Sequence, residues 1–229
     1  LKQKLESLKH KDRMFTVGIP PVRSSYDLPG VISRFMAHYP DINVKIDNRL
    51  EEEIEKDILT GKVDAAIGML TRAYPGVHYE CLQENRMYLL IPRSFACISH
   101  LKPDEATFEN PYLLEGNCLD QYTMLLARTG GGHYRMATVM MEKYGIVPRN
   151  TVYCSNMNLL YQLVGEGMGF LFCTPDPFIK AFPQYTDRIA FCILQKEWQI
   201  QKTYIGYMDE NPNAEMLQTF VKFMKEKDN

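Results

Sequence analysis

Short apolar runs alternate with amphipathic segments along the chain, and this pattern predicts an α/β fold. Residues 14–19 (MFTVGI), 42–46 (INVKI) and 63–69 (VDAAIGM) are typical of buried strands. Between them, the spacing of apolar positions predicts helices over residues 28–38 and 50–60, and Gly61 is expected to end the second helix. This order of elements makes a βαβαβ unit.

A second group of elements follows the first. Strands are expected over residues 77–82 and 87–91, where Pro92 ends the run, and a last strand and helix over residues 203–208 and 214–225. In between, the pattern predicts strands near residues 112–116, 151–155, 169–174 and 189–194, and helices over residues 121–128, 133–144 and 158–166. No repeat and no low-complexity linker separates the two groups. On pattern alone, the last strand and helix fit either group.

Composition narrows the class of protein. The chain has 229 residues, of which 45% are hydrophobic and 24% charged, so one large domain or two small ones are expected. A net charge of −2 argues against this chain as a whole being a nucleic-acid clamp. No apolar run reaches the ~20 residues of a membrane span, and no leader-like segment opens the chain, so we expect no membrane partner and a cytoplasmic location. The first residues, with Leu1, Leu5 and Leu8 on one face, fit either a surface helix or the end of a longer one.

Catalytic and metal-binding motifs are hard to find. No serine lies in G-x-S-x-G, there is no H-E-x-x-H, and the five histidines are scattered, so we expect no enzyme, no cofactor and no metal. The six cysteines have neither zinc spacing nor the spacing of a compact disulfide framework, and most lie in apolar runs. Cys118 is the one thiol near a predicted strand end. We interpret Glu51, Glu52, Glu53 and Glu55 as the solvated face at a helix start, where negative charge favours the dipole.

Three stretches resemble the effector-binding domain of LysR-type transcriptional regulators. The first helix region carries LP, an aromatic residue and YP. The second carries an L-x-x-G-x-x-D pattern shifted by one residue. A late segment carries V-x-x-G-x-G and a later proline, with one extra glycine. The matching residues are Leu28, Pro29, Phe35, Tyr39 and Pro40; Leu59, Gly61 and Asp64; and Val164, Gly167, Gly169 and Pro175, with Gly165 extra. Each pattern is weak alone, but their order is specific. The resemblance covers residues 14 to 226.

The resemblance implies two Rossmann-like subdomains joined by two crossing segments, a type-2 periplasmic-binding-protein fold with a ligand cleft between them. Subdomain I would hold residues 14–92 and 200–229, which places the last strand in the first sheet, and subdomain II residues 93–199. Residues 1–13 would be the end of the family's linker helix. DNA would then be bound only by an N-terminal winged helix-turn-helix that this chain does not contain.

Candidate effector contacts follow from the strand ends, because α/β proteins bind ligands beyond the carboxyl ends of their strands. Ser24 and Ser25 are expected to cap the first helix and to present donors to an anion, with charge from Arg23. The alternative is that one serine only caps the helix and Arg23 is solvated. From the second half, Ser155 or Asn156 is expected to cap the helix near residue 158. The full candidate set is Pro21, Val22, Arg23, Ser24, Ser25, Gly116, Asn117, Ser155, Asn156, Thr174 and Pro175.

Three functional classes therefore remain. The leading one is the effector-sensing domain of a LysR-type regulator, which binds a small polar or anionic metabolite. The alternative is an extracytoplasmic solute-binding protein of a transporter, although six cysteines without visible pairing suit an exported protein poorly. An enzyme on the same fold is the third, and the lack of an acid/base constellation counts against it. The resemblance also implies a homodimer or higher homo-oligomer formed through the first helix, in which Met36 and Tyr39 lie partly off the core-facing side.

Overall fold

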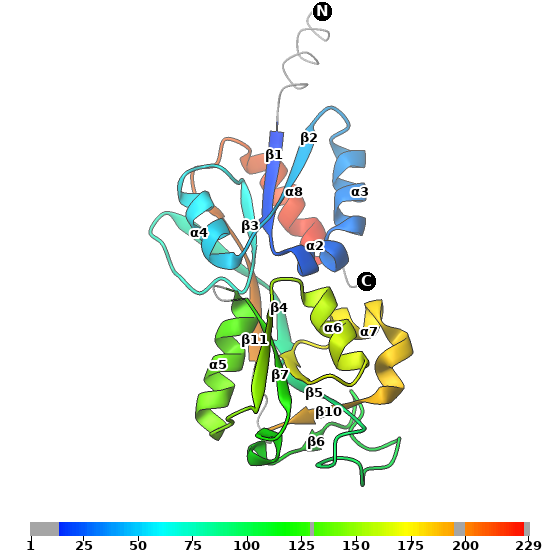
Figure 1. The fold of residues 1–229 in the computed structure, drawn as a ribbon. Helices are drawn as coiled ribbons and strands as arrows, with labels where there is room; N and C mark the ends of the chain where they lie inside the picture. The colour runs from blue at the N-terminus through cyan, green and yellow to red at the C-terminus, as the bar shows by residue number, and fades with distance from the viewer. Residues whose placement is uncertain (1–13, 129–130, 195–199, 227–229) are drawn as a thin grey trace, which may run out of the picture. The chain divides into compact units, whose positions relative to one another are not determined.

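The computed structural model describes residues 14–128, 131–194 and 200–226, so the predicted end of a linker helix over residues 1–13 lies outside the described residues. The chain divides into two compact units, which are described one at a time (Figure 1). The first contains residues up to Glu84 and from Lys202 onward, and the second contains Asn85 to Gln201. Each unit has its own sheet flanked by helices, which confirms the α/β class with two sheets.

The sheet of the first unit has the strand order β2-β1-β3-β11-β4. Strand β1 pairs in parallel with both β2 and β3, so the predicted βαβαβ unit is confirmed. The last strand, β11, runs antiparallel to β3 and therefore belongs to the first sheet, as the resemblance implied. The bounds are Met14–Ile19 (β1), Asn43–Asn48 (β2), Ala65–Gly68 (β3), Val77–Arg86 (β4) and Ile200–Met208 (β11).

Helices cover both faces of this sheet. On one face, α3 (Pro29–His38) and α8 (Ala214–Lys225) pack against β1, where the ring centroids of Phe15, Phe35 and Phe220 lie 4.9 to 5.3 Å apart. On the other face, α4 (Glu51–Leu59) packs Ile54 and Ile58 against the sheet. The contact is close, because a Cβ added to Gly18 would lie 1.9 Å from a methyl group of Ile54. An unpredicted short helix, α2 (Pro21–Asp27), precedes α3.

The sheet of the second unit has the order β6-β10-β5-β9-β7-β8. Strand β7 is parallel to β8 and β9, whereas β5 is antiparallel to β9 and β10. The bounds are Tyr88–Pro92 (β5), Tyr112–Leu113 (β6), Thr123–Ala127 (β7), Asn150–Cys154 (β8), Phe170–Cys173 (β9) and Ile189–Ile193 (β10).

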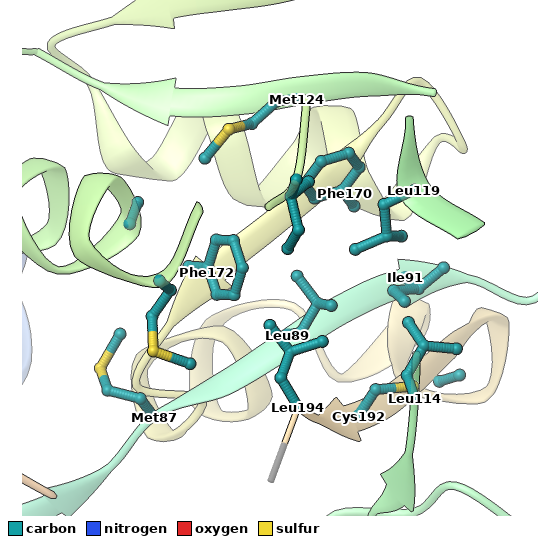
Figure 2. Packing of buried hydrophobic residues seen from close by; sticks show 14 of the residues in the cluster. Met87, Leu89, Ile91, Leu114, Leu119, Met124, Phe170, Phe172, Cys192 and Leu194 are labelled. Atoms are coloured by element: carbon teal, nitrogen blue, oxygen red, sulfur yellow. The ribbon is translucent and has the colours of Figure 1, made fainter. Parts of the chain in front are cut away.

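The second unit also carries helices on both faces. The apolar stripe of α5 (Gly132–Tyr144), with Met136 and Met140, packs into a core that includes Leu89 and Phe172 (Figure 2). Helix α6 (Met157–Gly165) contacts β5, β7 and β9, and its buried Tyr161 packs against the ring of Phe178 on α7 (Asp176–Ala181). Two short 3₁₀ helices, η1 (Gly116–Leu119) and η2 (Pro183–Arg188), complete the unit.

Three sequence predictions about this region were wrong. Residues 121–128 were expected to be a helix, but they form β7, because the run MLLA is buried between β8 and β9 and tertiary pairing overrides a weak helical pattern. The expected strand over residues 112–116 is the two-residue β6. Residues 85–92 had been placed in the first subdomain, but β5 pairs within the second sheet, and so the boundary falls after Glu84.

One arginine organises a long irregular segment of the second unit. Residues 93–111, all of them described, form only turns and bends. The guanidinium group of Arg93 donates to the backbone carbonyls of Lys102 and Pro103 at 3.1 Å and of Glu105 at 2.7 Å, with a longer contact of 3.5 Å to Ala106. Arg93 therefore takes the place of a strand or helix partner for these carbonyl groups.

Candidate functional site

In the first unit, the carboxyl ends of the parallel strands β1, β2 and β3 share one edge of the sheet, and α2 begins there. The expectation that Ser24 and Ser25 cap this helix was wrong. Pro20 occupies the capping position, and both serines lie inside α2. Their hydroxyl groups donate to the Pro21 carbonyl oxygen, at 2.7 Å from Ser24 and 3.2 Å from Ser25. The hydroxyl hydrogens are therefore directed to the helix backbone, as serines inside helices often direct them.

Arg23 is not simply solvated, which was the alternative interpretation. Its guanidinium group donates to Asp27 Oδ2 at 2.8 Å across one helical turn, and both side chains are only 12% exposed. The positive charge that was expected to receive an anion is balanced within α2 itself. Of the other candidates here, Pro21 is exposed and Val22 is partly buried.

The acidic helix start at this edge is only in part a solvated face: Glu53 is exposed and Glu52 partly exposed, whereas the interpretation was wrong for Glu51 and Glu55. Glu51 and Glu55 are 4% and 1% exposed. The Oε1 atom of Glu55 accepts the backbone N–H groups of Thr71 at 2.7 Å and Arg72 at 3.3 Å, in the loop after β3. The sequence contained a signal for this burial. Glu51 and Glu55 lie on the same helical face as Ile54 and Ile58, which is the face expected to pack against the sheet.

The loop after β3 holds a cation that the sequence analysis did not single out. The guanidinium group of Arg72 donates to the Tyr74 hydroxyl at 3.3 Å, and this hydrogen bond raises the pKa of Arg72. The backbone N–H of Tyr74 in turn donates to the Tyr79 hydroxyl at 3.4 Å. Buried Glu55 and the two tyrosines thus define the conformation of residues 71–74.

In the second unit, the parallel strands β7, β8 and β9 end at one edge of the sheet, and candidate residues follow two of them. Asn156 caps α6, as expected: its Oδ1 atom accepts the N–H groups of Asn158 at 3.0 Å and Leu159 at 3.4 Å. Ser155 is exposed, whereas Thr174, after β9, is 3% exposed and the next residue, Pro175, is also buried. The structure therefore brings Ser155, Asn156, Thr174 and Pro175 to the same edge.

Arg128 lies at this edge and was missed. It follows β7 directly, it is exposed, and its backbone N–H donates to the Cys154 carbonyl at 3.0 Å. Sequence reasoning had placed Arg128 at the end of a helix, so its position after a central strand was not recognised. Nearby, Gly131 occupies the capping position of α5 without a side-chain cap. Thr129 and Gly130, which connect β7 to this helix, lie outside the described residues.

Gly116 and Asn117 do not join the other candidates of the second unit. Both lie on η1, which precedes β7, and β6 is at the opposite side of the sheet from β8. A Cβ added to Gly116 would lie 3.1 Å from Ile146 and 3.3 Å from Tyr144, at the far end of α5. The reason is the order of elements along the chain. Because η1 leads into β7, it lies near the amino end of that strand, whereas the other candidates lie at the carboxyl ends of β8 and β9.

Within the described part of the chain, no group of three or more His, Cys, Asp or Glu side chains is arranged to hold a metal ion. None of the described helices is both long and apolar enough to cross a membrane. At the carboxyl edge of the second sheet, burial raises the pKa of the Cys173 thiol at the end of β9. The candidate groups at that edge are hydroxyl, amide and guanidinium groups, and the partly exposed carboxylate of Asp176 follows Pro175.

The family model described as the LysR substrate binding domain matches residues 9–229. The chain belongs to this family. It is therefore a LysR-type effector-binding regulatory domain, and the solute-binding alternative is not favoured. No curated protein sequence matches the chain.

Solved structures of LysR-type domains share the fold at low sequence identity. The regulatory domain of CcmR from Synechocystis PCC6803, in complex with 2-PG, has a TM-score of 0.75 at 13% identity, covering 95% of this chain and 99% of that one. The reduced form of the OxyR regulatory domain from Pseudomonas aeruginosa has a TM-score of 0.72 at 15% identity, with 95% and 99% covered. The BenM effector-binding domain with its effector benzoate has a TM-score of 0.69 at 14% identity, with 94% and 91% covered. At these identities, the likeness extends to the fold alone.

Proposed function

We propose that this LysR-type domain senses a small polar or anionic metabolite, and that the carboxyl edge of the second sheet supplies its main contacts. One observation carries the proposal: three adjacent parallel strands, β7, β8 and β9, end together and are followed by Arg128, Ser155 with Asn156, and Thr174. The carboxyl ends of parallel strands are where α/β folds bind ligands.

The chemistry of this edge selects the ligand class. A guanidinium group is a bidentate donor to carboxylate or phosphate, and serine and threonine hydroxyls add neutral hydrogen bonds. The Asn156 side-chain oxygen is occupied by the start of α6, so its amide nitrogen is the atom left to donate outward. A ligand with one anionic group beside a small polar or apolar body fits this donor set.

In the first unit, α2 offers little to an anion. The side chains of Arg23, Ser24 and Ser25 are already bound by Asp27 and by the Pro21 carbonyl oxygen. We therefore assign the proposed effector contacts to the second unit.

The effector site is tested by direct binding. Isothermal titration of a panel of small carboxylates and phosphates, including benzoate and 2-PG, is expected to yield at least one ligand. Arg128→Gln is expected to weaken that ligand about tenfold or more, since a hydrogen bond to a charged group contributes ~1.5–3 kcal/mol. Arg149→Gln is the matched control, because Arg149 is exposed at the amino end of β8. Equal affinities of the two variants would contradict the assignment, and a panel without any ligand would contradict an anionic effector.

We also propose a homodimer in which each copy uses two surfaces. Helix α3 exposes Met36 (44%), and the segment around the edge strand β8 exposes Val147 (71%) and Tyr153 (67%), which we call the β8 surface. Tyr39, in contrast, packs on its own unit and its hydroxyl lies 3.0 Å from Thr219 Oγ1. A two-fold axis that pairs α3 of one copy with the β8 surface of the other uses both surfaces twice.

Light scattering over micromolar concentrations tests the dimer. Wild-type protein is expected to dimerise, and Met36→Glu or Tyr153→Glu is expected to shift it to monomer, because a charge in an apolar interface loses its hydration. Met168→Glu is the control, since Met168 is 53% exposed but lies on neither surface. A monomer at every concentration would remove the proposal.

In the full regulator, we propose that effector binding shifts the balance between dimer arrangements and that an N-terminal DNA-binding domain reads the shift. A cytoplasmic location suits this role. All six cysteines are free in the structure, which is the usual state of thiols in that compartment.

A further inference from the structure

The carboxyl edge of the second sheet carries a negative charge as well as the positive charge of Arg128. Asp176 begins α7, three residues after the end of β9, and it is partly exposed. Burial raises the pKa of Cys173, the last residue of β9, and the nearby charge of Asp176 raises it further, which agrees with a carboxylate close to this strand end. The proposed effector site therefore contains an anion and a cation.

Arg128 and Asp176 follow adjacent strands of the sheet. Strands β7 and β9 pair in parallel with Leu125 opposite Leu171, and continuing this register places Arg128 level with Thr174. One strand spacing and two further residues then separate Arg128 from Asp176, on the order of 10 Å between their Cα atoms. A small molecule that carries two opposite charges fits this separation.

No side chain in the described part of the chain forms an ion pair with Arg128 or Asp176. Lys180 lies one helical turn along α7, but it is exposed, and an ion pair with such a side chain contributes little. The contrast is with Arg23 and Asp27, which bind each other within α2. Both charges of the second unit are therefore available to a ligand.

Asn158 adds an acceptor without a partner at the start of α6. Its Oδ1 atom is buried, and no described group donates a hydrogen bond to it. Further along α6, Tyr161 packs against Phe178 on α7, and the ring of Tyr185 lies against Gly165. Positions three and seven residues apart share a helical face, so Asn158 lies on the face of α6 that is turned toward α7 (Figure 1). A buried acceptor is costly without a donor, so this atom requires a partner.

Asn158 and Asp176 lie at the same end of α6 and α7. The ring contacts of α6 continue in the same order along α7 and η2, so the two segments run in the same direction. Both begin directly after the carboxyl ends of strands, α6 after β8 and α7 after β9. The two acceptors therefore share the edge that also carries Arg128.

We propose that the effector is a small zwitterion of the amino-acid class, whose ammonium group binds the Asp176 carboxylate and the Asn158 Oδ1 atom while its carboxylate binds Arg128. This inference rests on the proposed effector site and specifies the ligand class that the site selects. An ammonium group has three donors, so it binds the carboxylate and the buried amide oxygen together. Asp176 also repels a ligand that is only anionic, which disfavours simple carboxylates.

A hydroxyl group in place of the ammonium is a weaker fit for these two acceptors. A hydroxyl has one hydrogen to donate, so it binds either Asp176 or Asn158, but not both. It also has no charge, so the repulsion between Asp176 and the ligand carboxylate is left uncompensated. The site is therefore expected to distinguish an amino acid from the 2-hydroxy acid of the same shape.

Matched ligands on the wild-type chain test the inference. Isothermal titration compares a panel of L-amino acids with the corresponding 2-hydroxy acids, which keep the carboxylate and replace the ammonium by a hydroxyl. At least one amino acid is expected to bind, and its 2-hydroxy analogue is expected to bind about tenfold more weakly, since a charged hydrogen bond is lost. A 2-hydroxy acid that binds as tightly as the amino acid overturns the inference, as does a panel in which no amino acid binds.

Variants assign the roles of the two acceptors. Asp176→Asn is expected to weaken the amino acid about tenfold and to leave the 2-hydroxy acid unchanged or more tightly bound, because the repulsion is removed. Asn158→Ala is expected to weaken the amino acid about threefold, as for loss of a single hydrogen bond. Asp187→Asn is the matched control, because Asp187 is exposed on η2, which leads into β10 at the opposite edge of the sheet, where Ile189 pairs with Pro92.

The same titrations separate this inference from the effector site itself. If Arg128→Gln weakens a purely anionic ligand and Asp176→Asn weakens no ligand, the effector site stands and the zwitterion is wrong. If Arg128→Gln leaves the affinity for every bound ligand unchanged, the effector site is wrong and this inference falls with it. Thermal melting without ligand verifies that each variant is folded, and the matched ligands on wild-type protein decide the ligand class even if a variant does not fold.

Discussion

The carboxyl edges of the two sheets use their polar side chains in opposite ways. In the first unit, Arg23, Ser24 and Ser25 are bound within α2, and buried Glu55 is bound to the loop after β3. In the second unit, Asn156 caps α6 with one atom, while Arg128 and Ser155 are exposed. The first edge is internally satisfied, and the second retains free donor capacity.

This difference shows that polar residues at a strand end are not by themselves a binding site. A side chain one helical turn from an opposite charge forms an ion pair before any ligand arrives, as Arg23 does with Asp27. A side chain with no such neighbour keeps its donors for other partners. Four substitutions test how far the two edges differ in this respect.

Glu55→Ala is expected to have the largest effect. It removes the acceptor of two backbone N–H groups in a site where the carboxylate is 1% exposed, so we expect the free energy of unfolding to fall by about 3 kcal/mol. Urea denaturation measures the loss, and hydrogen exchange should accelerate at Thr71 and Arg72. Glu55→Gln keeps an acceptor oxygen and should lose less than half as much. Equal losses in the two variants would mean that the negative charge of Glu55, rather than an acceptor oxygen at that position, stabilises the loop.

Asp27→Ala should make the first edge resemble the second. The loss of the ion pair is expected to lower the free energy of unfolding by about 1.5 kcal/mol, more than for an exposed pair because both side chains are 12% exposed. The released Arg23 guanidinium is then expected to bind anions, so sulfate should raise the melting temperature of Asp27→Ala more than that of wild type. Identical sulfate responses would contradict the view that Asp27 suppresses this edge.

Asn156→Ala removes the cap of α6 in the second unit. The free energy of unfolding is expected to fall by about 1 kcal/mol, the typical contribution of such a cap. Asn156→Asp is the matched comparison, because a carboxylate caps equally well and favours the helix dipole. A variant with aspartate that is as unstable as the alanine variant would show that the Asn156 amide nitrogen has a structural partner.

Ser24→Ala with Ser25→Ala should have the smallest effect. Both hydroxyls donate to a carbonyl that also lies in the first turn of α2, and alanine has the higher helix propensity, so we expect a change within ~0.5 kcal/mol. Ligand affinity is expected to change less than twofold. A tenfold loss of affinity would restore these serines as effector contacts.

Much of the fold followed from apolar periodicity. The βαβαβ unit and helices α5, α6 and α8 were predicted within one or two residues, because each combines a long periodic pattern with a clear end signal such as Gly61, which has φ of 66°. Strand β7 was not predicted, since a five-residue buried strand and one turn of a buried helix have the same apolar composition. Only pairing with β8 and β9 decides between them.

The site was less predictable than the fold. Asn156 was identified as a cap because its neighbours along the sequence determine that role. Arg128 was missed because its position at the site depends on where β7 ends. Gly116 was wrongly included because the sequence did not reveal that β6 pairs at the side of the sheet opposite β8. Asp27, the partner of Arg23, is four residues away and could have been recognised in the sequence. Spacing alone, however, does not show whether Arg23 binds Asp27 or a ligand, because that depends on the free energies of the two interactions.

Arg93 has a consequence for how the second unit tolerates sequence change. Its guanidinium group binds carbonyl oxygens of residues 102 to 106, and every amino acid supplies that same oxygen. The side chains at Lys102 and Pro103 are therefore free to diverge. Glu105 is less free, because its Oε2 atom accepts the backbone N–H of Lys102 at 2.8 Å, and Ala106, with φ of 57°, favours residues that accept a left-handed backbone. Most of the mutational cost in this segment is therefore expected at Arg93, its first residue, so the exposed positions that follow are able to acquire new surface chemistry without a change of backbone shape.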